Sequence, residues 1–136
     1  MSLIEIFSII IIHFIADFIM QDEKWALNKS KNLYDLLSHT FTYSIIWILP
    51  IWMLSSFYSN NVSYWINEDN MILFCIITFI AHTITDYFTS RIVSKKFAEG
   101  KYGSAIPNFG AFTLIGLDQC FHMIQLFTTY YYLIKI

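Results

Sequence analysis

The four histidines of this chain share one feature, which is an aspartate four positions away. The pairs are His13 with Asp17, His39 with Asp35, His82 with Asp86, and His122 with Asp118. Residues i and i+4 lie on one face of an α-helix, about 6 Å apart along its axis, so each pair would be presented together. Imidazole and carboxylate together suit Zn, Mn and Fe. We therefore interpret all eight residues as candidate ligands of a divalent metal.

The segments around these pairs are strongly apolar. Of 136 residues, 57% are hydrophobic and only 13% are charged, which is unusual for a soluble domain. Segments long enough to cross about 30 Å of hydrocarbon as helices are residues 3–20, 33–57, 71–88 and 112–133. Helices are the spanning option at this length, because a bilayer offers no partner to exposed backbone groups. The sequence predicts an all-α integral membrane protein, with four transmembrane helices in an up-down-up-down bundle and one domain over residues 1–136.

The order within the pairs alternates along the chain. Histidine precedes aspartate in the first and third segments and follows it in the second and fourth. Antiparallel neighbours require this inversion if each residue type keeps one depth, so we expect a layer of carboxylates above a layer of imidazoles. The repeated order also indicates two duplicated helical hairpins. Glu5 and the His13–Asp17 pair argue against a cleaved signal peptide in the first segment.

Basic residues predict the orientation, because Lys and Arg accumulate in cytoplasmic loops. Apart from Lys135, they lie between the first two segments and between the last two, at Lys24, Lys29, Lys31, Arg91, Lys95, Lys96 and Lys101. The middle connection carries Glu68 and Asp69 and no basic residue. We expect both termini outside and the carboxylate layer open to the cytoplasm.

Charge balance favours a bound cation. Four carboxylates in a partly desolvated bundle would repel one another and take up protons unless cations neutralise them. No Lys or Arg lies within the predicted spans, and Arg91 is the nearest candidate. One or two divalent ions would supply the charge, with any surplus residues orienting the ligands. Two alternatives stay open, namely a pathway for metal ions or protons and a self-neutralising structural network.

The leading functional hypothesis is metal-dependent hydrolysis, in which a bound ion activates water. Asp17, Asp86 and Asp118 are the candidate catalytic residues, and an aspartate that does not bind metal would act as general base. The candidate substrate-binding residues are Gln21, Arg91, Gln119 and Asn108. The substrate would be a small or lipid-linked molecule reaching the site from the cytoplasm or inner leaflet. A transporter or a metal-stapled structural protein is the competing interpretation.

Four strings carry a family resemblance, namely HFIADFIMQ, LLSHTFTY, AHTITDYFTS and NFGAFTLIGLDQCFH. Together they resemble the bacterial and phage inner-membrane family of domain of unknown function 3307, over nearly the whole chain. The resemblance implies a small polytopic membrane protein with conserved positions at His13, Asp17, Gln21, His39, His82, Asp86, Asp118, Gln119 and His122. The family name contains no activity. A looser analogy links the intramembrane His and Asp residues to membrane-bound metal-dependent hydrolases.

We expect membrane lipids and no nucleic acid as partners. A homodimer is compatible with this size, although no small-xxx-small motif marks an interface.

Overall fold

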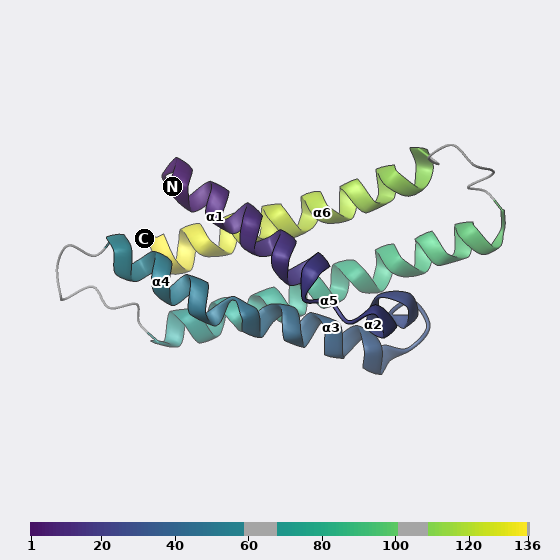
Figure 1. The fold of residues 1–136 in the computed structure, drawn as a ribbon, viewed down its shortest axis with the longest axis horizontal. Helices are drawn as coiled ribbons and strands as arrows, with labels where there is room; N and C mark the ends of the chain where they lie inside the picture. The colour runs from purple at the N-terminus through teal and green to yellow at the C-terminus, as the bar shows by residue number, and fades with distance from the viewer. Residues whose placement is uncertain (59–67, 101–108, 136) are drawn as a thin grey trace.

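The computed structural model describes residues 1–58, 68–100 and 109–135, and the regular structure of these residues is entirely helical (Figure 1). The α-helices are α1 (Leu3–Phe14), α2 (Glu23–Asn28), α3 (Leu33–Ile46), α4 (Ile48–Tyr58), α5 (Glu68–Ala98) and α6 (Phe109–Tyr130). Two short π-helical segments follow α1 and α6, namely η1 (Ile15–Ile19) and η2 (Tyr131–Lys135).

Helix α5 is the centre of the bundle. It packs against α3 and against α6, while α1 crosses α6 and η1 contacts α3. Both termini lie at the end of the bundle where α4 ends, and α2 lies toward the opposite end (Figure 1). A histidine and an aspartate on α5 can therefore face partners from η1, α3 and α6.

Side-chain caps set the starts of the first three helices. The Ser2 hydroxyl accepts from the Glu5 amide and the Glu5 carboxylate returns the bond, which forms a capping box at α1. Asp22 caps α2 by accepting from the Lys24 amide at 2.8 Å, and Asn32 caps α3 by accepting from the Tyr34 amide at 2.9 Å. These last two caps fold the connection between the first two predicted spans into a short helical turn.

The predicted helix boundaries differ from the structure in all four segments, and the fourth, predicted as residues 112–133, is α-helical over Phe109–Tyr130 and continues as η2. The first predicted helix, residues 3–20, changes from α to π geometry after Phe14. The second, residues 33–57, is interrupted at Trp47, because Pro50 has no N–H to donate to the Ile46 carbonyl and its ring crowds that turn. The third continues to Ala98 rather than ending at residue 88.

Two helical segments are long and apolar enough to cross a membrane, namely Leu33–Leu54 and Glu68–Ala98. The four predicted spans are therefore supported only in part. The regular part of α1 has 12 residues, which is too short alone. Helix α6 carries polar residues at Asp118, Gln119, His122 and Gln125, and these lower its mean hydropathy.

The hydrophobic core lies on the terminal side of the histidines. Its largest members are fully buried at Tyr43, Trp47, Phe74 and Leu126, joined by Ile9 from α1. Along each helix these residues lie one or two turns from the histidine, on the side opposite the aspartate. The core therefore closes one end of the polar cluster.

Candidate metal centre

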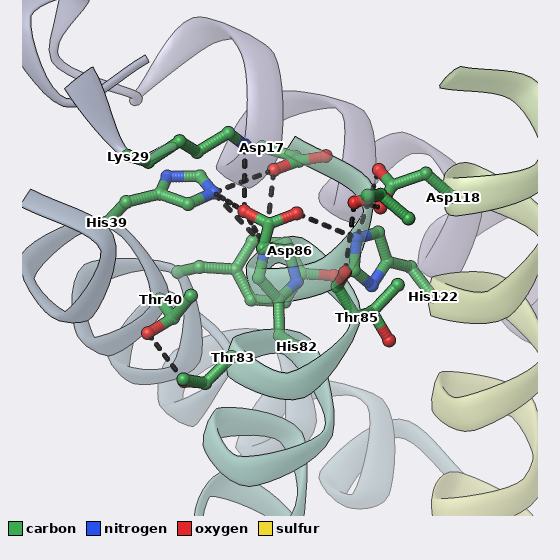
Figure 2. Close-up of polar contacts among 12 residues, drawn as sticks. Asp17, Lys29, His39, Thr40, His82, Thr83, Thr85, Asp86, Asp118 and His122 are labelled. Atoms are coloured by element: carbon green, nitrogen blue, oxygen red, sulfur yellow. Dashed lines mark hydrogen bonds and ion pairs between the residues drawn. The ribbon is translucent and has the colours of Figure 1, made fainter. Parts of the chain in front are cut away.

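Two aspartates and two histidines from three elements converge at the middle of the bundle (Figure 2). His39 Nε2 lies 3.2 Å from Asp17 Oδ1, 3.2 Å from Asp86 Oδ2 and 3.1 Å from His82 Nε2. His82 Nε2 lies 3.6 Å from the same two carboxylate oxygens. A single N–H on His39 cannot serve three acceptors at once, whereas a cation among them would be attractive to all of them.

The second half of the cluster is built by α5 and α6. His122 Nε2 lies 3.5 Å from Asp86 Oδ1 and 3.3 Å from Asp118 Oδ2, yet it has no hydrogen-bond partner among the described residues. The Thr89 hydroxyl donates to Asp118 Oδ1 at 2.7 Å and fixes that carboxylate. An unpartnered buried imidazole nitrogen beside two carboxylates has the environment of a metal ligand.

Two groups of side chains have the geometry to hold an ion. They are Asp17, His39 and His82, and His82, Asp86 and His122. Within each group the candidate ligand atoms all lie within 4.8 Å of one another, and every member is buried. His82 belongs to both groups, so the two candidate positions are adjacent.

The π-helical segment η1 sets the position of Asp17. The Met20 amide donates to the Ile15 carbonyl at 2.9 Å, five residues back, so the turn containing Asp17 is wider than an α-turn. His13 Nε2 and Asp17 Oδ2 are consequently 4.0 Å apart, and Asp17 turns toward its neighbours instead. Its two oxygens reach His39 and the side chain of Gln119.

Gln119 links the aspartates to His13. Its amide nitrogen donates to Asp17 Oδ2 at 3.0 Å and to Asp118 Oδ2 at 3.2 Å, so its oxygen must face His13 Nε2, at 2.6 Å. His13 Nε2 is then the donor, and Nδ1 accepts from the Tyr43 hydroxyl at 2.6 Å. Both ring nitrogens of His13 are engaged, and this histidine lies outside both ligand groups.

Lys29 is the cation that sequence reasoning missed. Its ammonium donates to Asp86 Oδ2 at 2.7 Å, although Lys29 lies in the short connection after α2 (Figure 2). Burial lowers the pKa of Lys29, but the charges of Asp86 and Asp17 outweigh this effect and raise the pKa above its usual value. Lys29 is therefore charged at neutral pH. The short helix at Glu23–Asn28 brings Lys29 over the site. Residue spacing in the sequence does not predict this contact, because Lys29 lies outside the predicted spans.

Residues 6–136 match the family described as Protein of unknown function (DUF3307). The chain belongs to the DUF3307 family. This confirms the resemblance seen in the sequence and covers essentially the whole chain. No curated protein and no solved structure matches it.

The other candidate site residues of this DUF3307 chain lie at varied distances from the centre. Asp35 is buried with its Oδ1 unpartnered in the described structure, and it belongs to neither ligand group. Arg91 stacks over the Tyr87 ring, 3.7 Å from its centroid, and donates to the Tyr87 carbonyl. Asn108 lies outside the described residues. Gln21 and Gln119 both line a cavity beside the centre.

That cavity has a volume of about 270 Å³ and reaches the carboxylates of the DUF3307 cluster. Its walls come from η1 and the α2 connection, from α5 and from α6. Asp17, Asp86, Asp118 and Lys29 all contribute to it. The aspartate side of the centre is therefore open, and the histidine side is closed by the hydrophobic core.

Proposed function

We propose that the chain is an integral membrane protein whose buried His/Asp cluster holds a divalent metal ion and hydrolyses a substrate that enters from the cytoplasmic side. The observation that carries this proposal is the pair of overlapping ligand groups that share His82. Zn, Mn and Fe are the candidate ions. A bound ion of this kind polarises the scissile group and lowers the pKa of water toward neutrality.

The distribution of side chains supports membrane insertion. Buried positions include His39, Thr78, His82 and Asp86, while large apolar side chains such as Phe7 and Ile124 are more than half exposed. A soluble monomer rarely exposes so much contiguous apolar surface. Ionisable residues inside a membrane protein face the bundle interior and serve function. We therefore propose that all four predicted spans, residues 3–20, 33–57, 71–88 and 112–133, cross a bacterial inner membrane.

The proposed orientation places the cavity toward the cytoplasm, with both termini outside. The basic residues Lys24, Lys29 and Lys31 lie beside the cavity end of the bundle, as do Lys95 and Lys96 at the end of α5. Cytoplasmic loops carry this excess of positive charge. A substrate from the cytoplasm or inner leaflet would then meet the aspartates first.

Asp118 is the proposed general base. It lines the cavity, lies outside both ligand groups and is oriented by the Thr89 hydroxyl. A carboxylate that is held in place and remains accessible can accept the proton of an attacking water. Gln119 bonds to both Asp17 and Asp118, so it keeps the base and a proposed ligand in register.

The closed histidine side supports hydrolysis over transport. Trp47, Phe74 and Leu126 are fully buried beyond the imidazoles. The polar side chains in that region bond among themselves, with Gln125 donating to Thr78 at 3.1 Å and to Thr129 at 3.0 Å. A conducting path would need a continuous series of polar groups leading outward from the histidines, and the buried side chains of Trp47, Phe74 and Leu126 oppose one.

Elemental analysis of the detergent-purified protein tests the metal site. We expect near-stoichiometric Zn, Mn or Fe in the wild type and loss of metal in a His82→Gln, Asp86→Asn double variant. Glu23→Gln, at an exposed acid of α2, is the matched control and should keep its metal. Helical circular dichroism establishes that each variant is folded. A wild type that stays metal-free after purification with added metal and without chelator would overturn the proposal.

A further inference from the structure

The cavity beside the aspartates combines a cation with unpartnered polar groups. Lys29 lines it, with its side chain 19% exposed and its ammonium on Asp86. Gln21 and Ser90 also belong to the wall, and Gln21 Oε1 and Ser90 Oγ are buried with no hydrogen-bond partner within the described part of the chain. Buried polar atoms normally have partners, so these two mark a place where a ligand's polar groups fit.

The charge of Lys29 has a further use once a metal is present. Three carboxylates line this cavity, and Lys29 pairs with one of them, Asp86. A divalent ion held by His82, Asp86 and His122 would take over that neutralisation. The ammonium would then be available to a second anion at the mouth of the centre.

The rim of the same cavity is apolar and exposed. Phe18, Leu27 and Ile115 line it and are 49%, 69% and 43% exposed, respectively. Each of these side chains thus belongs both to the cavity wall and to the outer surface of the bundle. A small hydrophilic substrate gains nothing from such a rim, whereas a hydrocarbon chain does.

We propose that the cavity binds a phosphorylated lipid, with its phosphate monoester between Lys29 and the metal centre and its hydrocarbon chain leaving over Phe18, Leu27 and Ile115. The inference rests on the proposed function, because it names the substrate class of that same centre. A phosphate offers the negative charge that Lys29 pairs with and the acceptor oxygens that the Ser90 hydroxyl requires.

The reaction follows from this placement. Water supplies an oxygen to phosphorus, and the bond between phosphorus and the lipid oxygen breaks. Asp118 accepts one proton from the attacking water, and that proton is then passed on to the leaving lipid oxygen, so Asp118 is ionised again at the end of the reaction. The products are inorganic phosphate and a lipid alcohol, with no change in oxidation state.

Binding and turnover are measured with metal-loaded protein in dodecyl maltoside micelles and three probes. The probes are dioleoyl phosphatidic acid, glycerol 3-phosphate, which has the phosphate without the chains, and dioleoyl phosphatidylcholine, which lacks a phosphate monoester. We expect phosphatidic acid to raise the melting temperature and release inorganic phosphate. Glycerol 3-phosphate should bind at least about tenfold more weakly, and phosphatidylcholine should do neither.

Lys29→Gln is the decisive variant, with exposed Lys31→Gln as its matched control. Lys29→Gln should keep its metal and weaken phosphatidic acid binding by about tenfold or more, because it removes a charged hydrogen bond. Lys31→Gln should behave as the wild type does. Equal binding of phosphatidic acid and glycerol 3-phosphate, or no effect of Lys29→Gln on binding, would overturn the lipid inference. The proposed metal site would still be supported if the wild-type protein contains metal. A wild-type protein that binds no metal would instead overturn the proposed function itself.

Discussion

The imidazole rings of His82 and His122 stack with their centroids 3.9 Å apart and their planes inclined by only 11°. Two protonated rings at this distance would repel each other, so the stacked pair favours at most one charge. Neutral imidazole is the form that binds metal. The stack therefore brings two potential ligands side by side.

The shared position of His82 makes a prediction about metal content. His82→Gln should abolish binding at both ligand groups, because His82 belongs to each. His122→Gln should affect only the group that contains Asp86 and leave Asp17, His39 and His82 intact. Elemental analysis of the two variants after equilibrium dialysis measures this difference. Equal loss of metal in both would contradict two separable positions.

Asp86 and Asp35 give a second, matched comparison. Asp86 lies within 3.2 Å of His39, within 3.5 Å of His122 and within 2.7 Å of Lys29, whereas Asp35 belongs to neither ligand group. Asp86→Asn should lower metal affinity by about two orders of magnitude or more, because it removes a charged ligand. Loss of a residue that only hydrogen-bonds to a ligand typically lowers metal affinity by about 10–100-fold. Asp35→Asn should bind metal as the wild type does. Competition titration with a chromophoric chelator measures both affinities, and equal losses would show that the two aspartates act alike.

Residue spacing predicted which residues belong to the cluster better than it predicted how they are arranged. The four-residue separation anticipated that His39, His82, Asp86 and His122 would meet, because helix periodicity alone puts such pairs on one face. The spacing did not distinguish Asp35, whose carboxylate joins neither group although it follows the same rule.

Two features depended on contacts that no local pattern encodes. The π-helical turn around Asp17 changes the direction of its carboxylate, and it was not distinguishable from an α-turn in the sequence. Lys29 enters the site because caps at Asp22 and Asn32 fold the intervening connection. The family resemblance was confirmed. The predicted helix boundaries differ where the structure has π-helical turns or a break at Trp47.

Two half-buried glutamines of α6, Gln119 and Gln125, allow a test of the link to His13. Gln119→Leu removes the bonds to His13, Asp17 and Asp118 and leaves buried polar atoms unpaired, at about 1–3 kcal/mol for each group. It should also reduce metal affinity by about 10–100-fold, because it disorders Asp17. Gln125→Leu breaks only the bonds to Thr78 and Thr129, so it should lose stability and keep its metal affinity. Thermal unfolding in detergent and the chelator competition together separate the two effects. Identical metal affinities for the two variants would exclude a positioning role for Gln119.

Glu5 anchors the opposite end of the bundle and provides a prediction about stability alone. Its Oε1 accepts from the Tyr130 hydroxyl at 3.0 Å and from the Lys135 ammonium at 3.0 Å, and the residue is only 1% exposed. Glu5→Gln should lower the free energy of unfolding by about 1–3 kcal/mol, because the buried network loses the negative charge that pairs with Lys135. Metal content should not change, since Glu5 lies about 12 Å along α1 from His13. Glu68→Gln, at an exposed acid in the first turn of α5, is the control and should alter neither quantity. Loss of metal in Glu5→Gln would mean that the two ends of the bundle are coupled through α1.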